Sequence, residues 1–313
     1  MVDLSVSLGK LVLTNPVMNA SGTYGYGEEY SEYVPLNRLG AFVTKTITKE
    51  AKQGNPPPRV YETPSGMLNS IGLENVGVRR LLEEYLPRLE SIDTKVIVSV
   101  GGNSLQEYQD VARILSGEKR VDGLELNLSC PNVQEGGLHF GRSDQTAGQL
   151  VKAVRETTDL FMSVKLSPSA DVLEVAKACR EAGCDCVSLI NTIPGMAVNI
   201  RTRRPWLGGI TGGLSGPAIR PVAVYWVYRL RRELDISIIG IGGIMTGEDA
   251  LEFIIAGASA IQIGTGNFVD PETPLKVIEG ISRYCECQGV DRLSSLIGCL
   301  SLEELPHRNQ TTE

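Results

Sequence analysis

The feature that most constrains this chain is an eightfold alternation of short apolar runs with helix-like stretches. The apolar runs lie at 17–22, 41–46, 96–100, 122–132, 161–166, 186–191, 236–241 and 260–264. Apolar residues recur at helical spacing over 104–116, 144–157, 171–182, 218–234, 247–256 and 274–284. Strands that alternate with helices build a parallel sheet. Eight repeats predict a closed (β/α)8 TIM barrel rather than a doubly wound sheet.

No break in composition, low-complexity tract or long linker divides the chain, so residues 1–313 are predicted to form a single domain. Residues 1–14 precede the first strand and are predicted to form a hairpin that plugs the bottom of the barrel. The polar tail, 306–313, is expected to fray. Two long segments, 47–75 and 193–216, interrupt the repeat. Loops of this length are usually functional, and those that follow barrel strands lie at the catalytic end.

Composition and charge exclude several classes of protein. The net charge of −7 argues against a nucleic-acid partner. No apolar run approaches the ~20 residues that span a bilayer, and the N-terminus lacks the basic and apolar regions of a signal peptide. Together with an odd count of 7 Cys, these features predict reduced thiols and a cytoplasmic location.

Two Cys-x-Cys pairs, Cys184/Cys186 and Cys285/Cys287, are candidates for metal ligands. Zinc and iron–sulfur sites usually have wider Cys-x2-Cys spacings with further ligands in step. The chain also has only 2 His. We therefore expect no metal site, and we expect Cys179, Cys184 and Cys186 to fill the core.

Polar residues collect where the predicted strands end. They are Ser21, Lys45, Ser99, Asn127, Lys165, Asn191 and Thr192. The carboxyl ends of barrel strands surround the active site, so these are candidate site residues. A single lysine at a strand end is often a surface residue that extends to water. Two lysines that face one mouth, Lys45 and Lys165, favour a site for an anionic ligand or an electron-rich ring.

The fourth apolar run carries a cysteine at its end. Leu124, Leu126 and Leu128 alternate with polar residues, which is the period of a strand, and Pro131 ends it. Cys130 is either a small buried side chain or a reactive thiol that acts as nucleophile or general base. A nucleophilic pair would need His139, which lies in the glycine-bracketed segment 136–141.

Glycine clusters punctuate the last third of the chain, at 212–216, 242–243 and 264–266. Glycine-rich turns before helices bind phosphate, and barrels often hold phosphate after strands seven and eight. The alternative is ordinary turn chemistry, because glycine readily adopts positive φ. Two clusters at these strand ends favour a phosphorylated cofactor, whose identity the residues leave open.

Specific motifs link the chain to a known family. They are KT at 45–46, NSIGLEN at 69–75, NLSCPN at 127–132, VKLSP at 164–168, NT at 191–192 and the glycine clusters. With these motifs the chain resembles the class 1 dihydroorotate dehydrogenases from Asn15 to about Pro271. The family consists of FMN-dependent barrels that oxidise (S)-dihydroorotate to orotate in pyrimidine (UMP) biosynthesis. Residues 63–69, 194–196 and 211–219 resemble the type 1B catalytic subunit.

The resemblance implies roles for individual residues. Cys130 would be the general base for the C5 proton of dihydroorotate, while hydride passes from C6 to flavin N5. Lys45 would lie between flavin and substrate and act on both. The implied substrate-binding residues are Lys45, Asn69, Ser70, Ile71, Gly72, Leu73, Asn127, Asn191 and Thr192. The implied FMN-binding residues are Ser21, Lys45, Thr46, Ser99, Asn127, Lys165, Ile190, Gly216, Gly242, Gly243, Gly264 and Thr265.

The resemblance also implies a partner. Type 1B subunits form a homodimeric core of a heterotetramer with a subunit that carries FAD and a 2Fe-2S cluster and passes electrons to NAD⁺. This chain has no cysteine run for such a cluster and no Gly-x-Gly-x-x-Gly after a strand. Electrons are therefore expected to leave one FMN per chain through a partner.

Three alternatives remain at this point. One is a type 1A-like enzyme that uses fumarate. Another is the FMN barrel of a dihydropyrimidine dehydrogenase, which shares the Asn-x-Ser-Cys-Pro motif, although NVQEGG at 132–137 resembles the dihydroorotate enzymes. The third is a barrel that binds a phosphorylated ligand without chemistry.

Overall fold

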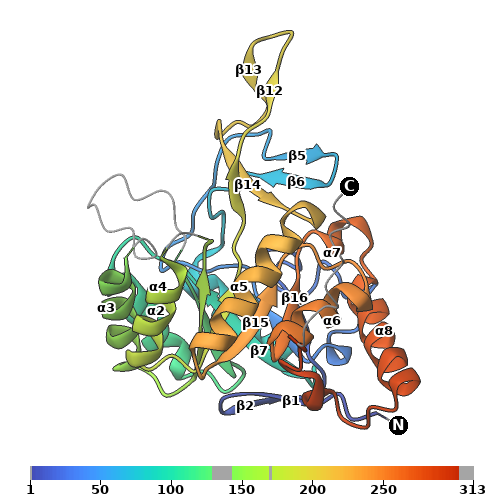
Figure 1. The fold of residues 1–313 in the computed structure, drawn as a ribbon. Helices are drawn as coiled ribbons and strands as arrows, with labels where there is room; N and C mark the ends of the chain where they lie inside the picture. Colours follow the sequence, from blue (N-terminus) through green and yellow to red (C-terminus); the bar gives the residue numbers. More distant parts are fainter. Residues whose placement is uncertain (1, 129–142, 169–170, 303–313) are drawn as a thin grey trace.

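A closed barrel of eight parallel strands forms the centre of the molecule (Figure 1). The computed structural model describes residues 2–128, 143–168 and 171–302. In order around the barrel the strands are β3 (Val17–Asn19), β4 (Ala41–Val43), β7 (Lys95–Val100), β8 (Gly123–Asn127), β9 (Phe161–Leu166), β10 (Cys186–Leu189), β15 (Ser237–Ile241) and β16 (Ala260–Ile263). This order follows the chain, and β16 pairs with β3 to close the barrel. The predicted (β/α)8 barrel is confirmed.

Helices cover the outside of the barrel. They are α2 (Leu105–Ser116), α3 (Asp144–Arg155), α4 (Val172–Glu181), α5 (Arg220–Glu233), α6 (Gly247–Ala256) and α8 (Thr273–Gln288). Ser104, Ser143 and Thr246 begin α2, α3 and α6 by accepting a backbone N–H with the side chain. The bounds of these helices lie close to those predicted from apolar spacing.

Shorter helical elements complete the chain. They are η1 (Leu36–Arg38), α1 (Gly77–Arg80), η2 (Leu81–Tyr85), η3 (Leu86–Leu89), η4 (Pro217–Ile219), α7 (Gly266–Val269) and η5 (Leu293–Leu296). No helix was predicted at 77–89, where Pro87 interrupts the helical spacing. No helix within the described ranges is long and apolar enough to cross a membrane.

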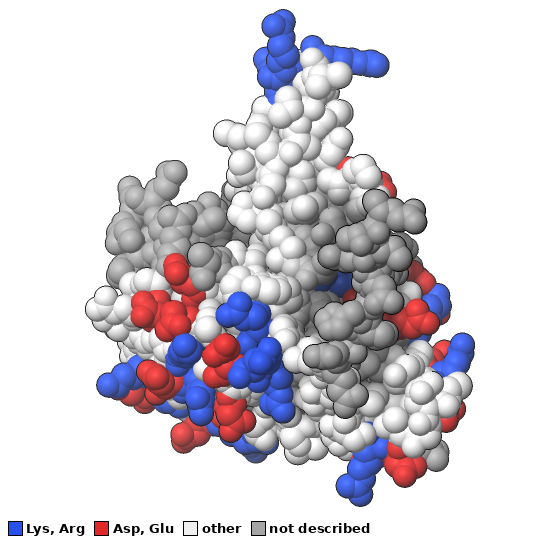
Figure 2. Space-filling view, viewed as in Figure 1, with Lys and Arg blue, Asp and Glu red and all other residues white. Residues whose placement is uncertain are grey.

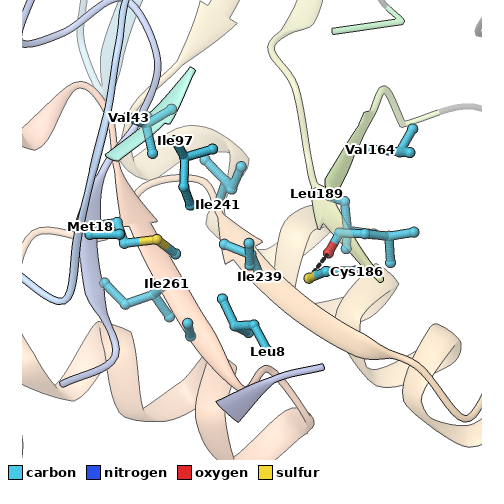
Figure 3. Close-up of a cluster of buried hydrophobic side chains, with 14 of the residues drawn as sticks. Leu8, Met18, Val43, Ile97, Val164, Cys186, Leu189, Ile239, Ile241 and Ile261 are labelled. Carbon is cyan, nitrogen blue, oxygen red and sulfur yellow. Dashed lines mark hydrogen bonds between the residues drawn. The ribbon is translucent and has the colours of Figure 1, made fainter. Parts of the chain in front are cut away.

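The N-terminal hairpin closes the end of the barrel where the strands begin. β1 (Val6–Leu8) pairs antiparallel with β2 (Leu11–Leu13). Gly9 N–H donates to Ser237 Oγ at the first residue of β15, 3.2 Å away. Figure 3 shows Leu8 in the buried cluster with Ile239 and Ile261. This is the position that the sequence predicted for the hairpin.

The predicted core cysteines are buried. Cys179 lies on α4, Cys184 follows that helix, and Cys186 begins β10. Burial raises the pKa of Cys184 to about 12. These thiols therefore pack the wall of the barrel and stay protonated near neutral pH.

The two insertions form a second sheet over the carboxyl end of the barrel. Its order is β11 (Ile193–Gly195), β14 (Gly212–Ser215), β6 (Gly66–Asn69) and β5 (Val60–Thr63), all antiparallel. The insertions also join where Gly208 N–H donates to Pro58 O, 2.7 Å away, and where the Tyr61 and Trp206 rings stack. The sequence did not predict this sheet, because its strands are short, rich in Gly and Pro, and paired across distant segments.

A narrow arm extends from this sheet. It is the hairpin of β12 (Val198–Asn199) and β13 (Arg204–Pro205). Figure 2 shows basic side chains at its tip, where Arg201, Arg203 and Arg204 are exposed. The arm stands well away from the barrel in Figure 1.

Candidate active site

Two lysines meet at the carboxyl end of the barrel. Lys165 lies in β9, and Lys45 follows β4 by two residues. Lys165 Nζ lies 3.4 Å from Ser21 Oγ, and a Cβ on Gly22 would lie 3.6 Å from Lys45 Nζ. Both ammonium groups thus approach the turn that follows β3. The predicted convergence of the two lysines on one mouth is confirmed.

The surroundings of the two lysines differ. Lys165 Nζ lies 3.8 Å from Oε1 of Glu125, whose side chain is 0% exposed. No carboxylate of the described residues lies within ion-pair distance of Lys45. Burial lowers the pKa of Lys45, with a smaller opposing effect from Glu74. An anionic ligand beside Lys45 would supply the missing counter-charge.

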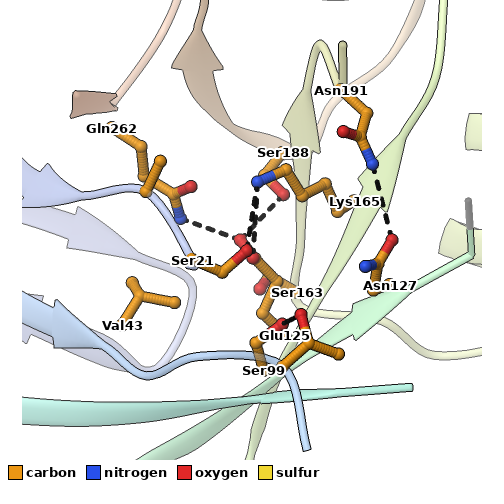
Figure 4. A network of polar contacts seen from close by, with 12 residues as sticks. Ser21, Val43, Ser99, Glu125, Asn127, Ser163, Lys165, Ser188, Asn191 and Gln262 are labelled. Atoms are coloured by element: carbon orange, nitrogen blue, oxygen red, sulfur yellow. Dashed lines mark hydrogen bonds and ion pairs between the residues drawn. The ribbon is translucent and has the colours of Figure 1, made fainter. Parts of the chain in front are cut away.

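A polar layer lies inside the barrel, below this mouth. Glu125 Oε2 accepts hydrogen bonds from Gln262 Nε2 at 2.8 Å and from Ser188 Oγ at 3.1 Å (Figure 4). The three residues come from β8, β16 and β10. Sequence reasoning missed Glu125, Gln262 and Ser188 as candidates. The available signal was a polar residue in the middle of each apolar strand.

A pair of amides lies beside Lys165. Asn191 Nδ2 donates to Asn127 Oδ1 at 3.4 Å (Figure 4), and Asn191 Oδ1 accepts from Thr192 N–H at 2.8 Å. Tyr108 Oη donates to the backbone oxygen of Asn127 at 2.6 Å. Amides offer both donors and acceptors, so this pair suits the polar edge of a planar ring.

The predicted substrate loop, residues 69–73, begins at Asn69, the last residue of β6 in the second sheet. Asn69 Nδ2 donates to Gly213 O at 3.3 Å, and a Cβ on Gly213 would overlap Thr192 Oγ1. Gly213 therefore lies between two predicted substrate residues from distant segments. Ser70 Oγ accepts from Asn55 Nδ2 at 2.9 Å, and the backbone oxygen of Ile71 accepts from Asn55 N–H at 3.0 Å.

The same loop turns sharply after Ile71. Gly72 and Leu73 have φ values of 73° and 56°. Positive φ is uncommon for a side chain such as leucine, so the surrounding contacts must hold this turn. Asn75 Nδ2 donates to Leu73 O at 2.8 Å, and Arg59 holds the flanking residues, because its guanidinium donates to Gln53 O and Asn55 O and pairs with Glu74.

Three predicted cofactor residues lie in a barrel strand or just after one. The hydroxyl groups of Thr46 and Ser99 share a hydrogen bond of 2.9 Å, and both side chains are buried. Ile190 is buried directly after β10, and its N–H donates to Ile241 O at 2.9 Å. The Thr46–Ser99 hydrogen bond connects the segment that follows β4 with strand β7, beside the mouth of the barrel.

The glycine clusters converge from three segments. Gly216 and Gly243 have φ values of 93° and 70°, and a Cβ on Gly243 would lie 2.8 Å from Gly216 O. Thr265 Oγ1 donates to Ser215 Oγ at 2.8 Å. A Cβ on Gly264 would make one ordinary contact, with Ala20 Cβ at 3.8 Å, so this backbone is only lightly covered. Gly242, with a φ of 137°, lies beside α5. Bare glycine backbone before η4 and α5 fits a phosphate group.

Several predicted residues lie outside the described ranges. They are Cys130 and His139, together with the C-terminal tail, 306–313. β8 ends at Asn127, before the end at Cys130–Pro131 that the sequence predicted. A surface depression lined by Ser116 and residues 155–160 lies where β9 begins, away from the end of the barrel where Lys45 and Lys165 converge.

Over the described ranges, no group of three or more His, Cys, Asp or Glu side chains could hold a metal ion.

Comparisons with known proteins identify the family. The model of the family "dihydroorotate dehydrogenase" matches residues 3–284. The catalytic subunit of dihydroorotate dehydrogenase B (NAD(+)) from Geotalea uraniireducens is 50% identical over 299 residues, covering 95% of this chain and 98% of that protein. The subunit of the same name from Bacteroides thetaiotaomicron is 47% identical over 303 residues, covering 96% and 100%.

A solved structure supports the fold. The dihydroorotate dehydrogenase (DHODH) of Eimeria tenella, in complex with ferulenol, superposes with a TM-score of 0.78 at 22% identity, covering 95% of this chain and 88% of that one. At this identity the likeness shows the fold alone, whereas the family match and the two bacterial relatives identify the family. The chain therefore belongs to the dihydroorotate dehydrogenase family.

Proposed function

We propose that the protein is the catalytic subunit of an NAD⁺-linked, FMN-dependent dihydroorotate dehydrogenase, which oxidises (S)-dihydroorotate to orotate in pyrimidine biosynthesis. One observation carries the proposal. In a chain of this family, Lys45, Lys165, the Asn127–Asn191 pair and the glycine clusters surround one end of the barrel. Fixed positive charge, amide groups and a phosphate cradle are the groups that a flavin and an anionic ring would need.

The residues present fit FMN. The backbone around Gly216, Gly243 and Gly264 would hold its phosphate, and Lys165 would supply fixed positive charge to its ring. The remaining residues proposed to hold it are Ser21, Lys45, Thr46, Ser99, Asn127, Ile190, Gly242 and Thr265. When bound, FMN supplies an acceptor for two electrons.

The substrate is an anion with a polar ring. Lys45 would bind and polarise it, and the negative charge would offset the cost of burying the ammonium. Asn127, Asn191 and Thr192 would orient the ring from the barrel side. The loop from Asn69 through Ser70, Ile71 and Gly72 to Leu73 would cover it and exclude water. Cys130 would take the C5 proton at Sγ as general base.

The electrons would leave through a second subunit that carries FAD and a 2Fe-2S cluster. Two observations support this step. The relatives are named as catalytic subunits of an NAD(+) enzyme, and this sequence has no cysteine run for a cluster. A homodimeric core, a cytoplasmic location and a single domain over 1–313 remain predictions.

Anaerobic reduction of the reconstituted protein tests the proposal. The protein is loaded with FMN and mixed separately with dihydroorotate and dihydrouracil, and flavin absorbance near ~450 nm is followed. Bleaching by dihydroorotate alone is expected. Bleaching by dihydrouracil alone would favour a dihydropyrimidine dehydrogenase, and failure to bind FMN would favour a non-catalytic barrel. Rapid reoxidation of the isolated chain by fumarate would favour the type 1A reaction.

The proposed partner is tested by purifying the protein from its own cells and asking whether a subunit that carries FAD and an iron–sulfur cluster purifies with it.

A further inference from the structure

Glu125 is a fully buried carboxylate to which neither the family motifs nor the proposed function gives a role. A buried charge is costly unless it is paired and hydrogen-bonded. Its Oε2 accepts from Gln262 Nε2 and Ser188 Oγ. Its Oε1 accepts no hydrogen bond from the described residues and faces Lys165 Nζ at 3.8 Å. These neighbours are donors or a cation, which is the environment of an ionised carboxylate.

Glu125 lies one layer deeper in the barrel than the proposed site. In the register of β8 with β9, Glu125 pairs with Ser163, whereas Asn127 pairs with Lys165. Asn127 and Lys165 are the residues that line the mouth. Lys165 Nζ contacts both Glu125 and Ser21, and Ser21 lies on the turn after β3 (Figure 4). Any effect of Glu125 on a ligand would therefore act through Lys165.

The two lysines of the mouth show what the carboxylate adds. Lys45 has no carboxylate partner among the described residues, and burial lowers its pKa. Lys165 is more deeply buried, with a side chain 7% exposed, and it has the counter-charge of Glu125. The site thus contains one buried cation without an ion pair and one with a neighbouring anion.

We propose that Glu125 is a positioning residue that acts through Lys165: its negative charge offsets part of the charge of the Lys165 ammonium and so lowers the reduction potential of the bound FMN. This inference rests on the proposed function. Reduced FMN carries more negative charge than oxidised FMN, and charges interact strongly where water is excluded. The carboxylate of Glu125 therefore opposes reduction, while Lys165 favours it.

The test compares Glu125→Gln with wild type by redox titration of the FMN-loaded proteins. Glutamine keeps the shape and can keep the hydrogen bonds, but removes the charge. The titration is run at pH 8, where the ring of reduced FMN carries a negative charge, and which is still below the ordinary pKa of an amine. We expect reduced FMN to gain about tenfold in affinity relative to oxidised FMN, which raises the potential of the two-electron couple by about 30 mV. An unchanged or lowered potential would overturn the inference.

Ser188→Ala is the matched control, because it removes a donor to the same carboxylate without changing charge. We expect its potential to stay at the wild-type value. A rise equal to that of Glu125→Gln would show that general disturbance of the polar layer causes the shift, and would overturn the charge-based account.

A second variant covers the case in which Glu125→Gln fails to fold. Glu125→Asp keeps the charge but draws it back from Lys165, so a smaller rise of the same sign is expected. An unchanged or lowered potential in this variant counts against the inference. Failure of the proposed function gives a different result, because the wild-type protein would then not bind FMN, or would bind it and not be reduced by dihydroorotate.

Discussion

Asn191 Nδ2 and Asn127 Oδ1 lie 3.4 Å apart at the mouth of the barrel. Asn127 ends β8 and Asn191 follows β10, while β9 and its Lys165 lie between them in the sheet. The pair therefore spans the end of the strand that carries the buried lysine. This arrangement brings two amides and one ammonium to the same place, and the following predictions test what it does.

Replacement of Cys130 tests the proposed base. Cys130→Ser should retain FMN but slow reduction of the flavin by dihydroorotate ~10²–10⁴-fold near neutral pH, the usual contribution of a general base. Single-turnover reduction in a stopped-flow instrument measures the step directly. Cys287→Ser, at an exposed cysteine, is the control and should behave as wild type. Reduction at the wild-type rate in Cys130→Ser would remove this residue from the mechanism.

The pKa of Lys45 predicts how binding depends on pH. Burial lowers this pKa, so the ammonium loses its proton at a lower pH than an exposed lysine would. Affinity for orotate, an anion, should therefore fall as pH rises toward the ordinary lysine range, and Lys45→Met should bind weakly at all pH values. Titration of the FMN-loaded protein with orotate between pH 6 and 10 gives the two profiles. Parallel profiles in the two proteins would contradict the assignment.

Substitution of Gly243 tests the phosphate cradle. Gly243→Ala adds a Cβ at a φ of 70°, about 2.8 Å from Gly216 O, so FMN affinity should fall at least ~10-fold. Gly289→Ala is a matched control, because Gly289 has a φ of 65° but nothing within 4 Å of the added Cβ. Both variants should lose about 1 kcal/mol of stability through backbone strain, and Gly243→Ala should lose more because its Cβ also meets Gly216 O. Fluorescence titration of the apoprotein with FMN separates them, and equal losses of affinity would refute the cradle.

Arg59 is predicted to position the substrate loop. It donates to Gln53 O and Asn55 O and pairs with Glu74, while its own carbonyl accepts from Ser70 N–H at 2.8 Å. Arg59→Ala should raise KM for dihydroorotate roughly 10–100-fold through misplacement of the loop, and FMN content should be unchanged. Arg79→Ala, which breaks only an exposed pair with Glu83, should have no effect. A wild-type KM in Arg59→Ala would contradict this role.

The sequence by itself determined the barrel and the position of its mouth. Strand and helix periods are local properties, and parallel strands in a closed barrel must end at the same face, so Lys45, Asn127, Lys165 and Asn191 could be grouped before their contacts were known. The family motifs then suggested roles for these residues. The role of Cys130 stays a prediction, because this residue lies outside the described ranges.

Only the tertiary structure decided what the polar residues contact. In β8, the alternation of Leu124, Glu125 and Leu126 is also the pattern of a strand with one face in water. Closure of the barrel turns Glu125 inward instead, toward Gln262 and Lys165 on other strands. The second sheet likewise depends on pairing between segments far apart in the chain, such as Asn69 with Gly213. Local pattern determines which residues form a strand, but the partners of a buried side chain are fixed by closure and long-range packing.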